Sequence, residues 1–146
     1  MKQIFLAITM SISSFIMTAS ANEITSSPLA VSSFENSFPT AADIMWKEVG
    51  DFYQATFVLD GQILSAFYSE AGDFIAVTKN ISFFDLPLNL QLNLKKDDRS
   101  WIKDIISVST TSGNAYYLQI ENAGSTMIYK SFNNKKWVLQ SVNDKF

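Results

Sequence analysis

The sequence contains no cysteine and no histidine among its 146 residues. Without cysteine the chain forms no disulfide, so an ordinary hydrophobic core has to stabilise the fold. The absence of both residues excludes Ser-His-Asp and Cys-His catalysis and the usual zinc sites. No glycine-rich phosphate-binding loop is present. We therefore expect a protein that is not an enzyme and that holds no cofactor and no metal.

Positive charge is also sparse and scattered. The chain has 11 Lys and Arg against 14 Asp and Glu, and Arg99 is its single arginine. A run or stripe of basic residues is the usual signature of a nucleic-acid-binding surface, and the sequence shows none. We expect no nucleic-acid partner, and no binding to an anionic membrane surface.

The one long apolar run lies near the N-terminus. Ile4–Met17 follows Lys2 and precedes Ala19-Ser20-Ala21, which matches the small-x-small rule for signal-peptide cleavage. The run is short for a membrane span. We expect residues 1–21 to be a signal peptide, and the mature chain from Asn22 to be periplasmic or secreted, with no membrane insertion after cleavage. Its 125 residues suit one domain.

A β-hairpin is predicted near the middle of the chain. Asp60-Gly61 is a strong signal for a two-residue type I′ turn, which needs positive φ at both positions. The turn would pair Leu59 with Gln62, Phe57 with Leu64, Ala55 with Ala66 and Tyr53 with Tyr68. Because side chains alternate along a strand, these eight share one nearly apolar face, which we expect to be the core face.

Other elements follow from caps and periodicity. Ser27 is typical of a helix N-cap and Pro28 of a first helical position, and Val31, Phe34 and Phe38 follow on one helical side. Pro39 would end this helix. Outside the hairpin, strands are predicted at Asp43–Glu48, near Asp73–Ser82, and at Trp101–Ser109, Ala115–Glu121, Ser125–Phe132 and Lys136–Val142.

The segment Asp85–Lys96 fits two structures. Its five leucines alternate strictly, which is a strand pattern. Against this, it lacks β-branched residues, and Asp85 with Pro87 is typical of a helix start. We favour a helix. The series Leu86, Leu90 and Leu94 would then face the core, with Leu88 and Leu92 on a second apolar strip.

An internal repeat is visible at an offset of 63 residues. Gly50 and Gly61 recur as Gly113 and Gly124, and the strand Tyr53-x-Ala55-x-Phe57 aligns with Tyr116-x-Leu118-x-Ile120. We predict a single domain, 22–146, built of two repeats, about 27–84 and 85–146. Each repeat would have one helix and three to four antiparallel strands. The fold class would be α+β, with one continuous antiparallel sheet and both helices packed on one of its faces.

These patterns resemble the PepSY-like family with the β-lactamase-inhibitor-like fold, a group of small exported bacterial proteins. The residues that carry the resemblance are Phe38-Pro39, Trp46, Tyr53-x-Ala55-x-Phe57, Gly61, Ala66-x-Tyr68, Gly72 and Leu86-Pro87. The resemblance implies a tandem of helix and strands with an open sheet face that binds a partner. Some relatives inhibit secreted hydrolases or accompany peptidases, but no inhibitory loop maps onto this sequence residue by residue.

Aromatic residues are abundant, at 14% of the chain, and a minority fall on the outward parity of the predicted strands. The candidate partner-binding face consists of Phe52, Ile63, Phe67, Tyr117, Ile128 and Phe132. Aromatic residues dominate the hot spots of protein interfaces. We therefore expect an exported module that uses this open sheet face or its loops to bind a protein of the envelope or secreted fraction. Isolated exposed apolar residues are also common on any protein surface. The alternative interpretation is that these six are scattered surface residues with no binding role.

A second functional hypothesis is a small-ligand carrier or sensor in the cell envelope. Trp46 and Trp101 each begin the strands that follow a predicted helix. If they were equivalent in the two repeats, they would line a pocket between the sheet and the helices.

Overall fold

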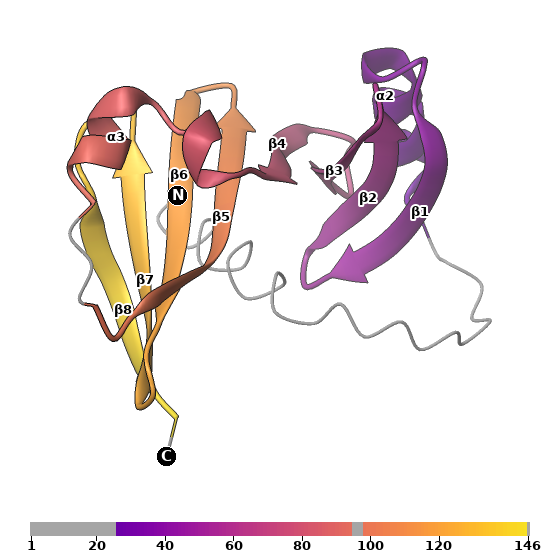
Figure 1. The fold of residues 1–146 in the computed structure, drawn as a ribbon. Helices are drawn as coiled ribbons and strands as arrows, with labels where there is room; N and C mark the ends of the chain where they lie inside the picture. The colour runs from indigo at the N-terminus through magenta and orange to yellow at the C-terminus, as the bar shows by residue number, and fades with distance from the viewer. Residues whose placement is uncertain (1–25, 95–97, 146) are drawn as a thin grey trace. The chain divides into compact units, whose positions relative to one another are not determined.

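The computed structural model of the protein describes residues 26–94 and 98–145, so the predicted signal peptide lies outside the described residues. Among these residues, the strands follow the order of the chain in an eight-stranded antiparallel sheet and are accompanied by two short α-helices (Figure 1). Two compact units divide the chain between Ile75 and Ala76, inside strand β4 (Phe74–Asn80). We call them unit 1 and unit 2. In the described part of the chain, no helix has the length and apolar character to cross a membrane.

The described part of unit 1 consists of one helix followed by a β-meander. Its elements are α2 (Pro28–Ser37), β1 (Ala42–Val49), β2 (Phe52–Leu59), β3 (Gln62–Ser69) and the start of β4. The predicted helix is confirmed: the Ser27 hydroxyl accepts from the Ala30 N–H at 3.4 Å and donates to the Glu70 carbonyl oxygen at 2.7 Å. The backbone N–H of Phe38 closes the last turn on Phe34, directly before Pro39. The cap therefore both starts α2 and ties it to the turn after β3.

The register of the central hairpin is the predicted one. All four predicted pairs between β2 and β3 are present. Asp60 and Gly61 have φ values of 50° and 74°, as a type I′ turn requires.

Aromatic side chains fill the space between α2 and the sheet of unit 1. The Phe34 ring lies 4.9 Å from Phe57 and 5.5 Å from Trp46, measured between ring centroids, in edge-to-face arrangements. Such pairs add to the stabilisation that burial itself supplies. Tyr68, also in contact with Phe34, is fully buried. The predicted core face of the hairpin is thus the face that α2 covers.

Unit 2 repeats the scheme of a short helix and a meander. Its elements after β4 are the 3₁₀-helix η2 (Phe83–Asp85), α3 (Leu88–Leu92), β5 (Trp101–Thr110), β6 (Gly113–Glu121), β7 (Ser125–Phe132) and β8 (Val138–Asp144). The order of elements in unit 2 parallels that in unit 1, and the two-repeat organisation stays a prediction. We also predicted that both helices pack on one face of the sheet. That statement concerns both units together, and it stays a prediction. The repeat boundary after residue 84 stays a prediction as well.

The leucine-rich segment forms a helix, although a short one of five residues. Leu86 and Leu90 are buried against Ile105, Leu118 and Ile120, and Leu94 packs on this cluster, as the helical interpretation predicts. Leu88 and Leu92 point away from the core. The alternation of leucines therefore comes from two sides of a helix and not from a strand.

An irregularity in β5 decides which way its first residue points. Trp101 pairs with Glu121 and Ile102 with Ile120, and the register shifts between Ile102 and Asp104. Because Ile102 packs on the α3 cluster, its neighbour Trp101 faces the opposite side of the sheet.

Candidate functional site

The predicted partner-binding face is only partly exposed in unit 1. Ile63 is 67% exposed and Phe52 is half-buried, but Phe67 is 2% exposed and therefore belongs to the buried residues. The expectation that Phe67 lies open to a partner was wrong. Strand alternation tells on which side of the sheet a residue lies, but not whether that side is covered.

Polar side chains separate the two exposed ends of this face in unit 1. The Gln54 amide donates to the Ser65 hydroxyl at 3.0 Å and to the Thr56 hydroxyl at 3.3 Å, and the two hydroxyls lie 3.2 Å apart. This cross-strand network lies between Phe52 at one end of β2 and Ile63 at the other end of its partner strand. In the described part of unit 1, polar side chains therefore interrupt the apolar residues on the side away from α2.

The predicted face in unit 2 has the same interruption. Tyr117 is 6% exposed, so the expectation that it is open to a partner was also wrong. The Lys130 Nζ lies 5.4 Å from the centre of the Tyr117 ring, and burial raises the pKa of Tyr117 to about 12 and lowers that of Lys130. Lys130 separates Ile128, which is half-buried, from Phe132, which is 40% exposed.

The two tryptophans predicted to line a ligand pocket do not occupy equivalent places. Trp46 packs on Phe34 beneath α2 in unit 1. Trp101 is 49% exposed on the side of its sheet that faces away from α3, where the Lys145 Nζ lies 5.3 Å from its ring centroid. Trp101 therefore does not line a space between α3 and the sheet.

The most exposed large apolar side chains that the structure describes in unit 2 lie on η2 and α3. Phe84 is 84% exposed, Leu88 67% and Leu92 76%. We call these three residues the α3 strip. Leu88 and Leu92 are one helical turn apart, on the side of α3 opposite the buried Leu90. The sequence signal was the second apolar strip of the leucine-rich helix, but its exposure was not predicted.

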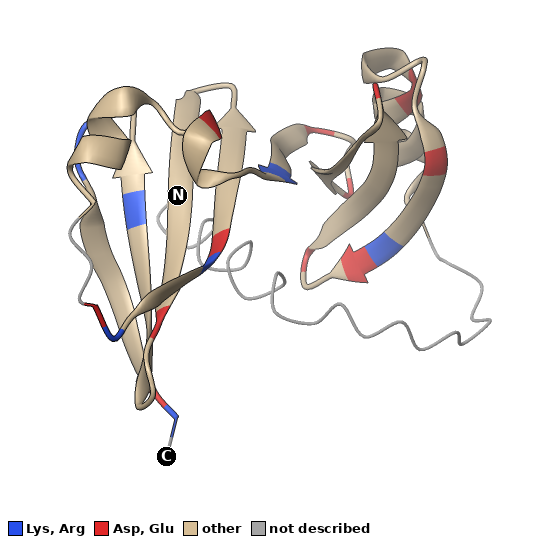
Figure 2. Ribbon diagram, viewed as in Figure 1, with Lys and Arg blue, Asp and Glu red and all other residues tan. Residues whose placement is uncertain are grey.

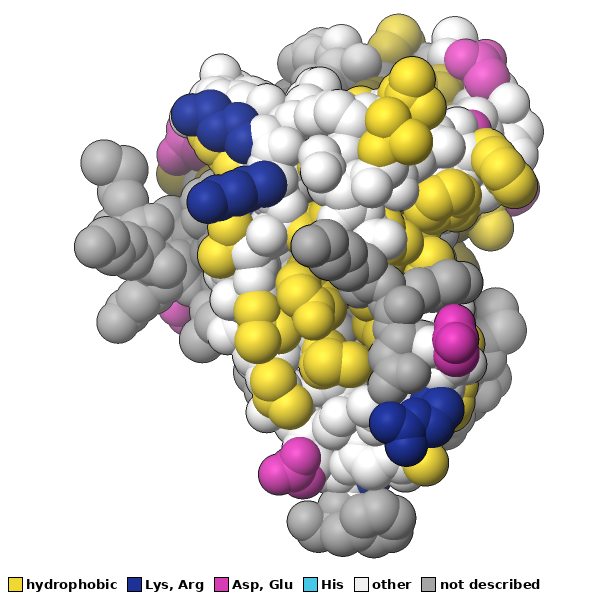
Figure 3. All heavy atoms as spheres, turned by 60° about the vertical axis from the view of Figure 1, so that its left-hand side comes forward, with side chains coloured by type: hydrophobic (Ala, Val, Ile, Leu, Met, Phe, Trp, Pro, Cys, Tyr) yellow, Lys and Arg dark blue, Asp and Glu magenta, His cyan; other side chains and the backbone are white. Residues whose placement is uncertain are grey.

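The edge strand β8 adds to the apolar surface on the α3 side of unit 2. Leu139 and Val142 are about half exposed and pair with Tyr129 and Met127, which pack on the core cluster under α3. Paired residues of neighbouring strands share a face. Figure 3 looks at unit 2 from the side of β8 and α3, and shows hydrophobic side chains gathered in patches on this surface. Apolar patches of this kind on a folded protein mark interaction sites.

Two hydrogen bonds hold α3 against the turn between β7 and β8. The Trp137 indole N–H donates to the Leu90 carbonyl oxygen at 3.0 Å. The Asn89 side-chain amide donates to the Asn134 carbonyl oxygen. A helix of five residues has almost no stability of its own, so these contacts and the burial of Leu90 position the α3 strip.

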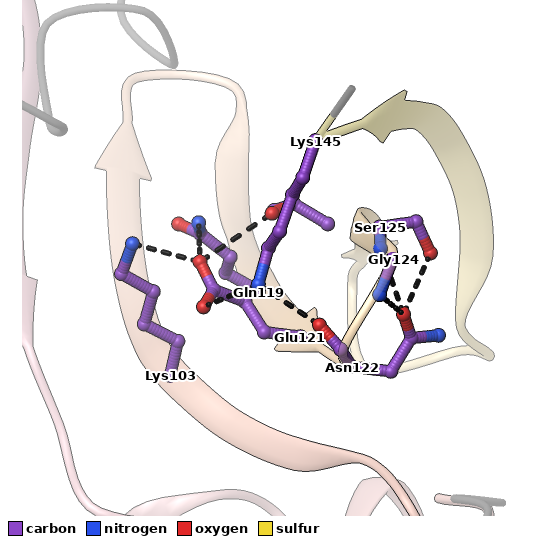
Figure 4. Close-up of polar contacts among 8 residues, drawn as sticks. Lys103, Gln119, Glu121, Asn122, Gly124, Ser125 and Lys145 are labelled. Atoms are coloured by element: carbon purple, nitrogen blue, oxygen red, sulfur yellow. Dashed lines mark hydrogen bonds and ion pairs between the residues drawn. The ribbon is translucent and has the colours of Figure 1, made fainter.

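A second cluster of functional groups lies on the other side of the unit 2 sheet. Glu121 accepts from the Lys103 ammonium at 2.8 Å and from the Lys145 ammonium at 3.3 Å (Figure 4). The hydrogen bond from Lys103, followed by that from Lys145, lowers the pKa of Glu121 despite its partial desolvation. The Gln119 amide and the Thr126 hydroxyl also contact the carboxylate.

This cluster has a structural explanation. Lys145 donates its backbone N–H to the Gly124 carbonyl oxygen at 2.9 Å and its ammonium to that of Asn122 at 2.9 Å. Together with Glu121, these contacts fasten the chain after β8 to the turn between β6 and β7. Within residues 26–94 and 98–145, no three Asp or Glu side chains lie together as metal ligands.

Comparison with known proteins supports the fold. No protein-family model matches the chain, and no match was found among the curated proteins. Among solved structures, the chain is similar to a BLIP-like protein from Bacteroides fragilis, with a TM-score of 0.69 and 13% identity over 85% of this chain and 89% of that one. BLIP-like denotes likeness to the β-lactamase inhibitor protein.

Two further structures agree. A DUF2874 family protein from Bacteroides uniformis aligns with a TM-score of 0.71 and 9% identity over 82% of this chain and 89% of that one. A protein from Bacteroides eggerthii, described as periplasmic, aligns with a TM-score of 0.70 and 11% identity over 80% and 87%. At these identities the likeness concerns the fold alone. It supports the BLIP-like part of the predicted resemblance and does not single out PepSY.

Proposed function

We propose that this chain is an exported, non-enzymatic module that binds another protein, and that the α3 strip is its principal contact surface. The observation that carries the proposal is the exposure of Phe84 on η2 and of Leu88 and Leu92 on α3. Burial of Leu90 and the hydrogen bond from Trp137 hold α3 in place. A soluble domain seldom exposes three large apolar side chains together unless a partner covers them. Fixed apolar anchors also lose little conformational entropy on binding.

The comparisons are consistent with this function. One neighbour is described as periplasmic and another as BLIP-like, which fits export and an interaction role. An inhibitor of, or an accessory to, a secreted hydrolase is the form of this function that the BLIP-like neighbour favours. The absence of histidine and cysteine from the chain agrees with a role that does not require catalysis. The small-ligand alternative gains no support from Trp46 and Trp101, because Trp101 does not lie between a helix and the sheet as Trp46 does.

The open sheet face remains a second candidate surface of the same module. Its exposed members are Ile63 in unit 1 and Phe132 in unit 2. Each is a single large apolar side chain beside polar neighbours, and for that reason we rank it below the α3 strip.

Capture with matched variants tests the proposal. The mature chain, residues 22–146, is used as bait against envelope and secreted fractions of the native host, beside Leu88→Ser/Leu92→Ser and Ile63→Ser/Phe132→Ser. Both double variants replace exposed side chains, so both should fold, which circular dichroism checks. We expect one protein enriched by the unaltered chain and by Ile63→Ser/Phe132→Ser, and lost with Leu88→Ser/Leu92→Ser. Equal enrichment by all three would refute the α3 strip as the contact surface.

A further inference from the structure

The turn between β7 and β8 presents two adjacent lysines beside α3. Asn134 accepts from Asn89, and Trp137 donates to the Leu90 carbonyl oxygen at 3.0 Å. Lys135 and Lys136 lie between these two attachment points in the sequence. Because both flanking residues bind α3 directly, the two lysines are held next to it. Figure 2 shows blue residues on this turn beside α3.

Both lysines are exposed. Neither forms an ion pair with the residues described, 26–94 and 98–145. The acidic groups of unit 2 that make close contacts have other partners. Glu121 pairs with Lys103 and Lys145, and Asp85 accepts from the backbone and hydroxyl of Ser82 at 2.9 and 2.7 Å.

The lysines flank the α3 strip instead of lying behind it. Successive residues of a helix are about 100° apart, so Asn89, which faces the turn, lies about a quarter-turn from Leu88. Viewed down the axis of α3, Leu92 lies close to Leu88, and the buried Leu90 lies on the opposite side of the helix. A partner bound to the α3 strip would therefore bring the residues beside its own apolar surface close to Lys135 and Lys136.

We infer that the α3 strip takes an amphipathic helix of a partner protein whose apolar side is bordered by acidic residues; the inference rests on the proposed function. Leu88 and Leu92 form a short ridge with the spacing of one helical turn, which packs into the groove between the ridges of another helix. An amphipathic helix binds in this way through apolar side chains spaced one helical turn apart. Carboxylates on the partner would meet the ammonium groups of Lys135 and Lys136, and this charge complementarity would set the orientation and speed of docking.

A protein partner fits these charges better than a lipid surface does. Electrostatic attachment to anionic membranes uses clusters of roughly four to eight basic residues. Here two lysines stand beside the α3 strip, on a chain whose net charge is −3. A membrane would also repel the acidic groups elsewhere on the chain, whereas a helix carrying a few carboxylates meets the lysines alone.

Two synthetic helical peptides test the inference with a defined probe. Both carry leucines at helical spacing, flanked in one by glutamates and in the other by lysines at the same positions. Binding to the mature chain is followed by fluorescence anisotropy at low salt. We expect the acidic peptide to bind about tenfold more tightly, since two exposed ion pairs are made in one case and two repulsions in the other.

The variants separate charge from apolar contact. Lys135→Glu/Lys136→Glu should reverse the preference, whereas Lys47→Glu, at an exposed position of β1 in unit 1, should leave it unchanged. Leu88→Ser/Leu92→Ser should weaken both peptides. Added salt should reduce the difference between them.

Each other outcome contradicts a defined part of the account. Equal binding of both peptides, still dependent on Leu88 and Leu92, would overturn the acidic partner and leave the α3 strip as a binding surface. Peptide binding that is unchanged in Leu88→Ser/Leu92→Ser would contradict the proposed function itself. No binding of either peptide, or lysine-dependent binding to phosphatidylglycerol vesicles in its place, would overturn the protein helix as occupant.

Discussion

Trp137 donates its indole N–H to the main-chain carbonyl oxygen of Leu90 across 3.0 Å, joining the residue directly before β8 to the middle of α3. The carbonyl groups at the end of a helix have no partner within the helix. In α3, with five residues, nearly every carbonyl is in this position. The tryptophan therefore completes the helix as well as positioning it, and the α3 strip depends on the contact.

Replacing Trp137 by Phe should destabilise unit 2 while keeping most of its packing. The Leu90 carbonyl oxygen would lose its donor, which costs about 1 kcal/mol in the free energy of unfolding. Urea unfolding followed by circular dichroism measures the change. Trp101→Phe is the matched control, because Trp101 is 49% exposed and should change stability by less. A larger loss for Trp101→Phe would contradict the structure.

Leu90→Ala and Leu88→Ala should differ strongly although the two residues are only two positions apart. Leu90 is fully buried, so its truncation leaves a cavity and costs about 2–5 kcal/mol. Leu88 is 67% exposed, and its truncation should change the free energy of unfolding by less than about 0.5 kcal/mol. In a strand the two would share a face, so similar losses would contradict the helix.

Gly72→Ala should destabilise unit 1 more than Gly61→Ala does. Both glycines have positive φ, 86° and 74°, so both substitutions strain the backbone, by about 1–2 kcal/mol. At Gly72 the new Cβ would also lie 2.8 Å from the Leu29 carbonyl oxygen of α2, whereas nothing lies within 4 Å at Gly61. The difference in unfolding midpoints isolates the contact between α2 and this turn. Equal losses would mean that α2 does not approach Gly72.

Glu121→Gln should reduce stability at neutral pH and matter less in acid. Its pKa is lowered in the folded protein from the ordinary 4.5, chiefly by Lys103, so its stabilising contribution is complete above that value. The contribution is lost as the pH falls through the lowered pKa. Unfolding midpoints of both proteins at about pH 7 and about pH 3 measure this. In a Lys103→Met background the effect of Glu121→Gln should shrink, and an unchanged effect at both pH values would contradict the pairing.

Local signals predicted much of the fold. The hairpin register followed from Asp60-Gly61 and strand alternation, because a two-residue turn leaves a single pairing. Ser27 and Pro28 located the start of α2, since capping depends on residues close in sequence. The lack of β-branched residues correctly favoured a helix at Leu88–Leu92 over the strand suggested by alternation.

The site was harder to predict because exposure is a tertiary property. Phe67 and Tyr117 lie on the predicted outward parity, yet both are buried. Trp101 was matched to Trp46 by its place after a helix, but the strand pairing of Ile102 turns it away from α3. The nearness of Lys135 to α3 depends on two contacts more than 40 residues apart in sequence, at Asn89 and Leu90.

Site-specific photo-crosslinking shows which residue of this protein lies against its partner. A photoreactive phenylalanine analogue is placed at Leu88 in one exported chain and at Ile63 in another, two positions with the same 67% exposure. After irradiation in the native host, we expect a discrete protein adduct from Leu88 that is absent or much weaker from Ile63. An adduct from Ile63 alone, or none from Leu88, would contradict the α3 strip as the surface through which this protein binds its partner.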